Sequence, residues 1–247
     1  MVAFSGSDPI GVLIGAKRLS STLVHKIAVH PDHRRQGHGR HLLTSLGSKL
    51  AILGPPRIVA EVPETLAGAS ELFSASGYAR EALLTDYVWQ GEEHEVARAG
   101  QPGRFVIPVT VDDLAANGLL GEASSDLCWK RSVETLTARK DDITGLAVAS
   151  DERIEACLLY VAGLDPEGNG EAGRASAAAA EIVALRTFID DDGAGLKQLL
   201  SRLAARGIRT VWFPKVHPAE FPSEVLETLG FRPAGGHLLF VAKARSE

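Results

Sequence analysis

Between residues 27 and 43 the chain reads Ile27-Ala28-Val29-His30-Pro31-Asp32-His33-Arg34-Arg35-Gln36-Gly37-His38-Gly39-Arg40-His41-Leu42-Leu43. Apolar residues that lead into this stretch, among them Leu23, lie on one face at a period of two, which predicts a strand. After it, leucines recur at helical spacing as far as Leu50, which predicts a helix that Gly54-Pro55-Pro56 ends. A basic loop that contains two glycines therefore joins a strand directly to a helix.

This loop has the composition of an anion-binding site. Gly37 and Gly39 have no Cβ atom, so a ligand can approach their backbone closely. The first N–H groups of the following helix have no partner within the helix, and the helix dipole favours negative charge at that end. Arg34, Arg35 and Arg40 add three positive charges to a chain whose net charge is −5. Together these features predict that the loop binds a phosphorylated ligand.

Histidines are also concentrated here, because five of the eight lie between residues 25 and 41. Such a cluster is one signature of a metal site. The stretch contains no cysteine, however, and Asp32 is its one acidic residue, while its arginines would repel a cation. We therefore expect no metal.

The overall composition excludes several classes of protein. A length of 247 residues with 45% apolar side chains is typical of a globular chain of one large or two small domains. The negative net charge argues against a nucleic-acid binder. No apolar segment reaches the about 20 residues of a membrane helix, and the first residues do not resemble a signal peptide. Two cysteines without a CxxC pair fit a reducing compartment, so we expect a cytoplasmic protein.

The order of the expected elements predicts an α+β fold in two units. Strands are expected over residues 2–4, 10–19, 23–29, 57–62, 82–89, 105–110, 144–149, 154–163, 177–189, 208–213 and 237–242. Besides the helix after the loop, helices are expected over residues 64–76, 112–120, 126–138, 195–206 and 223–229. Residues 93–104 have a linker composition, and 165–176 that of a mobile loop. The units are then 1–92 and 105–247, each a mixed, mostly antiparallel sheet flanked by helices.

The two halves repeat one order of elements. In each half a strand runs into a Gly-x-Gly loop, followed by a helix, a strand, a second helix and a glycine next to an aromatic residue. Gly37 corresponds in this order to Gly193, and Gly77-Tyr78 corresponds to Gly230-Phe231. The repetition indicates an ancient duplication.

Residues 10–80 resemble the GNAT superfamily of N-acyltransferases. The coenzyme A motif of that family, Arg/Gln-x-x-Gly-x-Gly/Ala, is matched by Arg34, Gly37 and Gly39 after an apolar strand and a proline. Residues 71–78 look like the later helix of the family and its Gly-aromatic turn. Residues 105–242 resemble the family more weakly but in the same order, so the chain is similar to tandem GNAT proteins.

The resemblance implies that acetyl-coenzyme A is the cosubstrate and that an amine attacks its thioester directly. The strand backbone would hold the pantetheine arm and the loop the pyrophosphate; the implied coenzyme residues are Ile27, Ala28, Val29, Arg34, Arg35, Gln36, Gly37, His38, Gly39 and Arg40. A general base would help the amine to lose its proton. Glu61 matches a strand glutamate of the family and is the candidate base, with His25 as a second candidate. A glutamate at a strand end is also commonly a solvated charge without a role.

Two positions depart from the family pattern. Phe73 stands where the family usually has a tyrosine that protonates the departing thiolate, and Leu66 stands where an asparagine is common. Phenylalanine has no proton to donate. The general acid is therefore Tyr78, Tyr87 or Ser74, or it is absent.

The second loop keeps the glycines but not the charge. Asp190, Asp191 and Asp192 stand where the first loop is basic. Carboxylates repel a pyrophosphate, and they can cap the N–H groups of the following helix themselves. We therefore expect the second unit to be a copy that does not bind the coenzyme, forms a wall of the acceptor site and stabilises the first unit.

The first unit is expected to lack the strand and two helices with which a complete unit opens, since few residues precede residue 10. Its sheet edge should then be covered by the second unit or by a partner chain, for example in a homodimer, because a bare edge invites aggregation.

The leading function is an N-acetyltransferase acting on an amine of a small molecule or a protein. The alternative is an acyl-coenzyme A-binding sensor or scaffold without catalysis, which the missing tyrosine favours. The pattern does not identify the acceptor.

Overall fold

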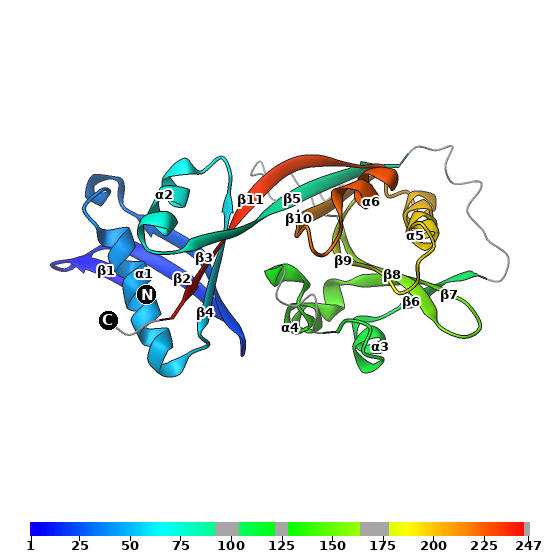
Figure 1. Ribbon diagram of the computed structural model, residues 1–247, viewed down its shortest axis with the longest axis horizontal. Coiled ribbons are helices and arrows are strands. Elements are labelled where there is room, and N and C mark those ends of the chain that lie inside the picture. Colours follow the sequence, from blue (N-terminus) through cyan, green and yellow to red (C-terminus); the bar gives the residue numbers. More distant parts are fainter. Residues whose placement is uncertain (92–103, 122–127, 164–177, 245–247) are drawn as a thin grey trace. The chain divides into compact units, whose positions relative to one another are not determined.

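The computed structural model describes residues 1–91, 104–121, 128–163 and 178–244. The chain folds into two compact units: unit 1 is Met1–Leu84 together with Gly236–Glu247, and unit 2 is Thr85–Gly235. The predicted α+β class is confirmed, because a mixed sheet flanked by helices makes up the fold (Figure 1).

Unit 1 contains the basic loop. Its elements are β1 (Val2–Ser5), β2 (Asp8–Lys17), β3 (Ser21–Val29), the short 3-10 helix η1 (Pro31–His33), α1 (His38–Leu53), β4 (Arg57–Pro63), α2 (Ala67–Ala75), the beginning of β5 (Ala79–Gln90) and the end of β11 (Phe231–Lys243). The strands are ordered β1-β2-β3-β4-β11. Only β3 and β4 are parallel neighbours in this series; the other pairs are antiparallel.

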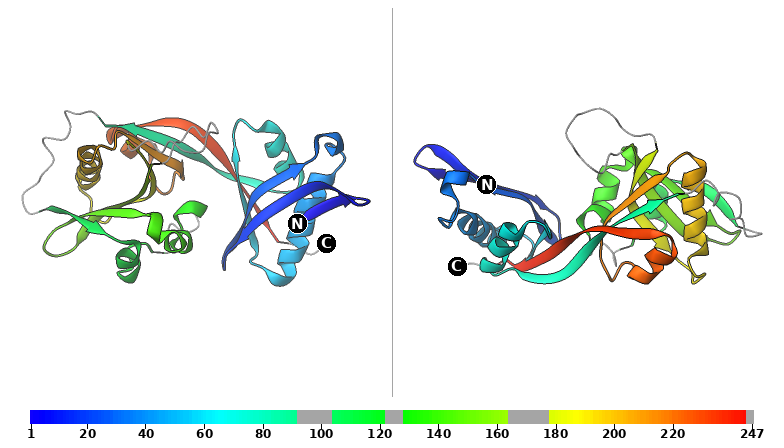
Figure 2. Two further views of the ribbon diagram at one scale, coloured as in Figure 1. Left: turned by 180° about the vertical axis from the view of Figure 1, so that it is seen from behind. Right: turned by 90° about the horizontal axis from the view of Figure 1, so that it is seen from above.

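One face of this sheet packs against α1 and α2. Alternate residues of β4 and β11 form a core with the leucines of α1 and with Phe73 of α2, as the period of two requires. On β4 these inward residues are Ile58, Ala60 and Val62, and on β11 they include Phe240. The left view of Figure 2 looks onto the opposite face, with the strands in front of α1.

β3 and β4 separate after a short paired segment. Ser21, Thr22 and Leu23 pair with the first three residues of β4, and no later residue of β3 pairs with β4. β3 nevertheless continues to Val29 alongside β2. The edge of β3 that faces β4 therefore carries backbone N–H and C=O groups from Val24 onward that have no strand partner.

Unit 2 has helices on both sheet faces. Its elements are β6 (Phe105–Val109), α3 (Val111–Ala116), η4 (Trp129–Arg131), α4 (Val133–Ala138), η5 (Lys140–Asp142), β7 (Thr144–Ala149), β8 (Ile154–Ala162), β9 (Ala179–Thr187), α5 (Ala194–Ala205), β10 (Thr210–Val216) and α6 (Ser223–Thr228). The strands are ordered β5-β10-β9-β8-β7-β6. One core includes leucines of α5 and α6, and another includes Leu114 of α3 and Leu136 of α4.

The last strand of each repeat crosses into the other unit. Thr85–Gln90 of β5 pair with β10 in unit 2, whereas His237–Lys243 of β11 pair with β4 in unit 1. The predicted boundaries of 1–92 and 105–247 differ from this division, because they assign each strand wholly to its own half. The order of elements along the chain is the same whether or not the two units exchange their last strands. The sequence repeat therefore does not reveal the exchange.

Most expected elements are present, with three differences. The helix expected over 112–120 is α3, which ends at Ala116, and the described part of 126–138, which begins at residue 128, contains η4 and then α4. β11 begins at Phe231, because strand pairing overrides the turn signal of its proline and glycines. The expected loop at 165–176 and residues 93–103 of the expected linker lie outside the described residues.

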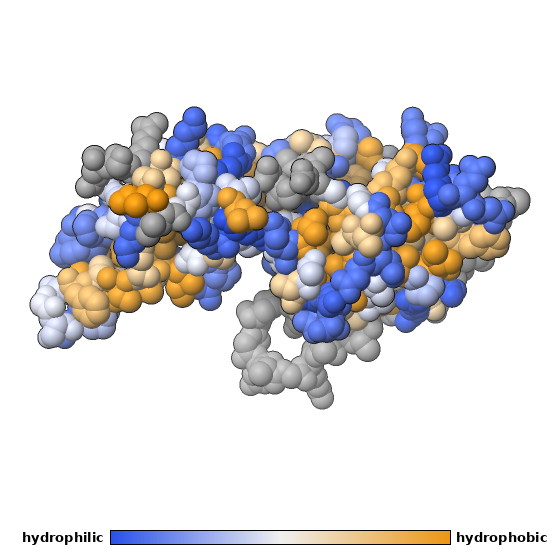
Figure 3. Space-filling model, turned by 90° about the horizontal axis from the view of Figure 1, so that it is seen from below, coloured by the Kyte–Doolittle hydropathy of each residue, from blue (hydrophilic) through white to orange (hydrophobic). Residues whose placement is uncertain are grey.

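The edge strand β1 exposes apolar side chains. Val2 is 51% and Phe4 is 60% exposed, and β1 ends the series of paired strands. Figure 3 shows apolar surface in orange among the polar residues. That another unit or chain covers this edge stays a prediction. None of the described helices is long and apolar enough to cross a membrane.

Candidate functional site

A cavity of about 990 Å³ lies in unit 1 at the carboxyl end of β3. Its walls are the end of β3, the basic loop, the start of α1 and one side of α2. The lining residues are Ile27, Ala28, Val29, His33, Arg34, Arg35, Gly37, His38, Gly39, Arg40, Leu66, Gly68, Ala69, Glu71, Leu72 and Ala75. The structure therefore brings together every predicted coenzyme residue except Gln36, whose amide Nε2 donates to the carbonyl of Asp32 at 3.1 Å.

Each glycine of the loop has a different physical role. Gly37 precedes α1 with φ of 89°, in the left-handed region, where a side chain would be strained. Gly39 has an ordinary backbone, but a Cβ there would lie 3.1 Å from Cδ2 of Leu72 in α2. Gly37 therefore turns the chain into the helix, and Gly39 lets α1 and α2 approach each other.

The start of α1 presents uncapped N–H groups. No side chain caps this helix at Gly37, and its first backbone hydrogen bond joins the N–H of His41 to the carbonyl of Gly37 at 2.9 Å. The N–H groups of His38, Gly39 and Arg40 thus have no acceptor within the helix. These three residues line the cavity, so the helix start offers donors to an anion.

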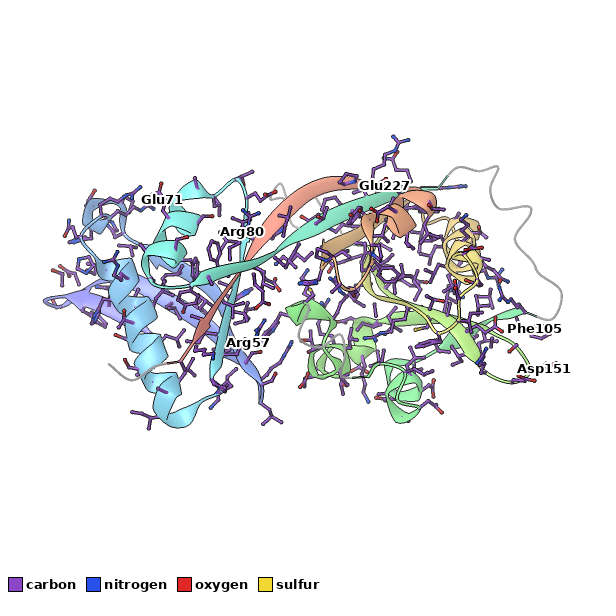
Figure 4. The ribbon with its side chains drawn as sticks, in the orientation of Figure 1. Arg57, Glu71, Arg80, Phe105, Asp151 and Glu227 are labelled. Carbon is purple, nitrogen blue, oxygen red and sulfur yellow. The ribbon has the colours of Figure 1, made fainter. Side chains whose placement is uncertain are left out.

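The three arginines of the loop are placed differently. Nε of Arg34 donates to the carbonyl of Val29 at 3.0 Å and so ties the loop to the end of β3. Arg35 forms an ion pair with Glu71 of α2, with Nη1 and Oε2 3.1 Å apart (Glu71 is labelled in Figure 4). Arg40 is exposed at the start of α1. The end of the cavity that is lined by the basic loop therefore contains a carboxylate besides its arginines.

Replacing Glu71 with Gln should tighten coenzyme A binding, because it removes a negative charge from the cavity and frees Arg35. The two side chains are 63% and 82% exposed, and exposed ion pairs contribute at most about 1 kcal/mol. The expected gain is therefore about two- to fivefold in Kd, largest at low ionic strength. Titration calorimetry at two salt concentrations measures this gain.

The control is Glu81→Gln, which breaks the comparable ion pair with Arg57 outside the cavity. Weaker binding by Glu71→Gln would show that the pair instead holds Arg35 in place for the ligand.

Neither candidate base lines the cavity. Glu61 lies on β4 beyond the last residue that pairs with β3, and it faces away from α1 and α2, because its neighbours Ala60 and Val62 face the core. His25 is exposed on β3. It lies at a bulge, since Val24 and Lys26 pair with consecutive residues of β2.

The candidate acids are scattered. The ring of Phe73 is buried between Phe240 and Tyr78, with centroids 5.7 and 5.2 Å away. Burial raises the pKa of Tyr78 to about 12, and its hydroxyl has no hydrogen-bond partner among the described residues. Tyr87 belongs to unit 2, and burial, followed by the charge of Glu227, raises its pKa. Ser74 is exposed on α2 and does not line the cavity.

The histidines of the loop contact one another. The rings of His30 and His33 are 5.9 Å apart, and those of His33 and His38 are 6.1 Å apart. In the part of the chain that the structure describes, no three His, Cys, Asp or Glu side chains converge as metal ligands would.

The second loop is occupied by its own side chains. Oδ2 of Asp191 accepts the N–H of Gly195 at 2.9 Å at the start of α5. The same atom is 2.9 Å from Nη1 of Arg104, whose Nε is 2.7 Å from Oε2 of Glu155. Arg104 is 15% exposed, so the ion pair is largely buried. The predicted capping of the second helix by aspartate is thus present. Sequence reasoning missed Arg104 because it had placed this residue in the linker.

In unit 2, β9 and β10 also separate after a short paired segment, but a buried side chain contacts the strand groups beyond it. β9 and β10 are parallel and pair over three residues, as β3 and β4 do. Just beyond, the carbonyls of Pro214 and Lys215 accept hydrogen bonds from the guanidinium of Arg131, which is 2% exposed. A buried arginine therefore satisfies carbonyl groups of β10 beyond the segment that pairs with β9.

Sequence reasoning also missed the wall that α2 contributes. The helix itself was expected, but the spacing of its apolar residues does not show which other element each face of the helix packs against. Leu66, Ala69, Glu71 and Leu72 therefore had no signal that placed them in the site, apart from the spacing that puts them on one side of a helix.

Comparison with known proteins agrees with this fold. Residues 1–80 match the acetyltransferase (GNAT) domain. The tandem GNAT protein from the clavulanic acid biosynthesis pathway is similar in structure, with TM-score 0.63 and 18% identity over 100% of this chain and 82% of that one. The glucosamine N-acetyltransferase region of a fungal multi-domain GH3 β-N-acetylglucosaminidase has TM-score 0.70 and 12% identity over 96% of this chain and 32% of that one.

A GCN5-related N-acetyltransferase from Anabaena variabilis has TM-score 0.63 and 9% identity over 99% of this chain and 62% of that one. This chain thus spans less than two thirds of the fungal protein and of the Anabaena variabilis protein. At such identities the likeness shows the fold alone. No curated protein matches the sequence.

Proposed function

We propose that this chain, which has a tandem GNAT fold and a GNAT acetyltransferase domain at residues 1–80, is an N-acetyltransferase that uses acetyl-coenzyme A. The acceptor is an amine of a small molecule or a protein. The observation that carries the proposal is the cavity at the end of β3, which is lined by the basic loop and the uncapped start of α1. We further propose a cytoplasmic location, since the chain has two cysteines and no CxxC pair.

The residues of the cavity fit the two polar parts of coenzyme A. The N–H groups of His38, Gly39 and Arg40, with the side chains of Arg35 and Arg40, suit the pyrophosphate. Beyond Leu23, the edge of β3 no longer pairs with β4, and it offers strand-like N–H and C=O groups to the amides of the pantetheine arm. Apolar Ile27 and Leu72 line the same cavity and suit the carbon atoms of that arm.

The reaction is a direct transfer. The nitrogen of the neutral amine attacks the thioester carbonyl carbon, the C–N bond forms, and the C–S bond breaks. The amine gives up one proton to a base, and the thiolate that leaves takes one from water. We propose Glu61 as the group that accepts the amine proton, because it lies on β4 in the segment that has separated from β3.

A test of the proposed function is release of free thiol from acetyl-coenzyme A. We expect release to depend on an added amine in a panel of glucosamine, other amino sugars, polyamines, aminoglycosides and peptides with a free amino terminus. Titration calorimetry with coenzyme A measures binding in parallel. An absence of binding would refute the proposal.

Binding without amine-dependent thiol release would support the second candidate, an acyl-coenzyme A sensor or scaffold. The observation that favours it is the burial of Phe73 in the core, where the resemblance leads us to expect an acidic hydroxyl.

A further inference from the structure

The strand β11 brings a histidine into unit 1 from the far end of the sequence. His237 pairs with Pro63 of β4, and Leu239, two residues on, pairs with Glu61. Residues that pair directly across an antiparallel ladder point to the same face of the sheet, and so do residues two apart on one strand. Glu61 and His237 therefore share a face as diagonal neighbours, with Cβ atoms within about 7–8 Å, which long side chains can span.

That face is the one that α1 and α2 do not cover. The residues between them in register, Val62 and Leu238, belong to the core with those helices. His237 is half-buried, and its Nδ1 atom is shielded from solvent. A titratable ring thus lies next to the candidate base on the sheet face opposite the two helices.

The charged surroundings of His237 in unit 1 are mainly acidic. Glu61 is on β4, and Glu64 follows that strand, with its N–H bonded to the carbonyl of Gly236 at 3.0 Å and its carboxylate against the Cα of Gly236. On β5, which is the other neighbour of β11, the charged residues within unit 1 are Arg80 and Glu81, and Glu81 is paired with Arg57 at 2.7 Å. Nearby carboxylates stabilise an imidazolium ion.

A carboxylate on its own is a poor general base for this reaction, because its pKa lies far below neutral pH. The reference pKa of glutamic acid is about 4.3 and that of histidine about 6.5, and a base works best when its pKa lies near the working pH. A glutamate that can pass its proton to a histidine is restored to the charged form at neutral pH. The same histidine can release the proton to water.

We propose that His237 is a proton-transfer partner of Glu61 in the acetyl transfer. Glu61 takes one proton from the amine, and the proton passes to the imidazole of His237 and then to solvent. The acetyl carbon exchanges its C–S bond for a C–N bond, and coenzyme A leaves as a thiolate that takes a proton from water. This inference rests on the proposed function, and it makes the site of unit 1 depend on a strand from the end of the chain.

The test uses the full chain, acetyl-coenzyme A, and glucosamine or whichever panel amine gives the fastest thiol release. For wild type we expect kcat to rise with pH through an ionisation in the histidine range. His237→Asn should remove that limb and lower kcat by about 100-fold, the low end for a positioned proton-transfer group. The KM for acetyl-coenzyme A should stay within about twofold, because His237 does not line the cavity. Added imidazole should restore activity to His237→Ala.

His217→Asn is the matched control, since His217 lies in unit 2 and Asn can replace its Nδ1 as the acceptor for the N–H of Ala219. An unchanged pH profile in His237→Asn would overturn the inference, as would a loss of activity that imidazole does not restore while the fold is intact. If His237→Asn fails to fold, the pH profile of His237→Gln and the imidazole rescue of His237→Ala test the inference instead. Failure of the proposed function looks different, because wild type itself would then release no thiol with any amine.

Discussion

Reversing the charge of Arg35 and Arg40 together, with Arg35→Glu and Arg40→Glu, is expected to abolish measurable coenzyme A binding. Both residues line the cavity at the basic loop. A hydrogen bond to a charged group contributes about 1.5–3 kcal/mol, and 1.4 kcal/mol is a factor of ten in affinity. Loss of two such contacts should therefore weaken binding by at least about 100-fold, before the repulsion by the new carboxylates is added.

Titration calorimetry measures this affinity and also the stoichiometry, which should be one coenzyme per chain. We expect no binding at the second loop, because Asp191 caps Gly195 and is paired with Arg104. The matched control is Lys49→Glu with Arg80→Glu, which changes the net charge by the same amount at two exposed positions of unit 1 outside the cavity. A stoichiometry near two, or binding that survives the arginine reversal, would contradict the assignment of the site.

Replacing Glu61 with Gln is expected to lower the turnover of acetyl transfer by about 100- to 10,000-fold, the range that a general base contributes. Gln keeps the size of the side chain but cannot accept the amine proton. The affinity for coenzyme A should be nearly unchanged, since Glu61 lies on the sheet face opposite the helices and does not line the cavity. Steady-state thiol release gives the turnover, and calorimetry gives the affinity.

A loss of less than about threefold, at a pH where wild type is active, would remove Glu61 from the reaction and leave His25 or water as the base. His25→Asn separates these two. A parallel loss of coenzyme affinity in Glu61→Gln would instead indicate a damaged fold, which thermal unfolding of the variant can detect.

The contrast between the two loops was readable from the sequence, although its details were not. Three arginines in one loop and three aspartates in the other predict opposite affinities for phosphate wherever the chain places them. The structure adds that Asp191 caps the helix, and that Arg104 and Glu155 accompany it. Arg104 had no local signal, because its ion pairs are with residues more than 50 positions away.

The position of the base and its neighbours depended on pairing between distant strands. The alternation along β4 predicts that Glu61 faces away from its apolar neighbours, but it does not name the strand that lies beside it. β11 occupies that place and brings His237 next to Glu61. A strand can pair with any edge that offers matching backbone groups, so no local pattern distinguishes this exchange from a unit that uses its own last strand.

The sequence by itself determined the elements whose causes are local. Residues 27–43 form a strand, a basic turn and a helix because the period of the apolar residues, the left-handed backbone at Gly37 and the arginine charges all act within a few positions of one another. Nine of the ten coenzyme residues that the GNAT resemblance implied line the cavity. Only the tertiary structure decided that α2 closes the cavity with Glu71 and Leu72, and that β11 completes the sheet of unit 1. The reason is physical: which faces and edges meet depends on the packing of the whole unit, and contacts between distant residues leave no periodic trace in either segment alone.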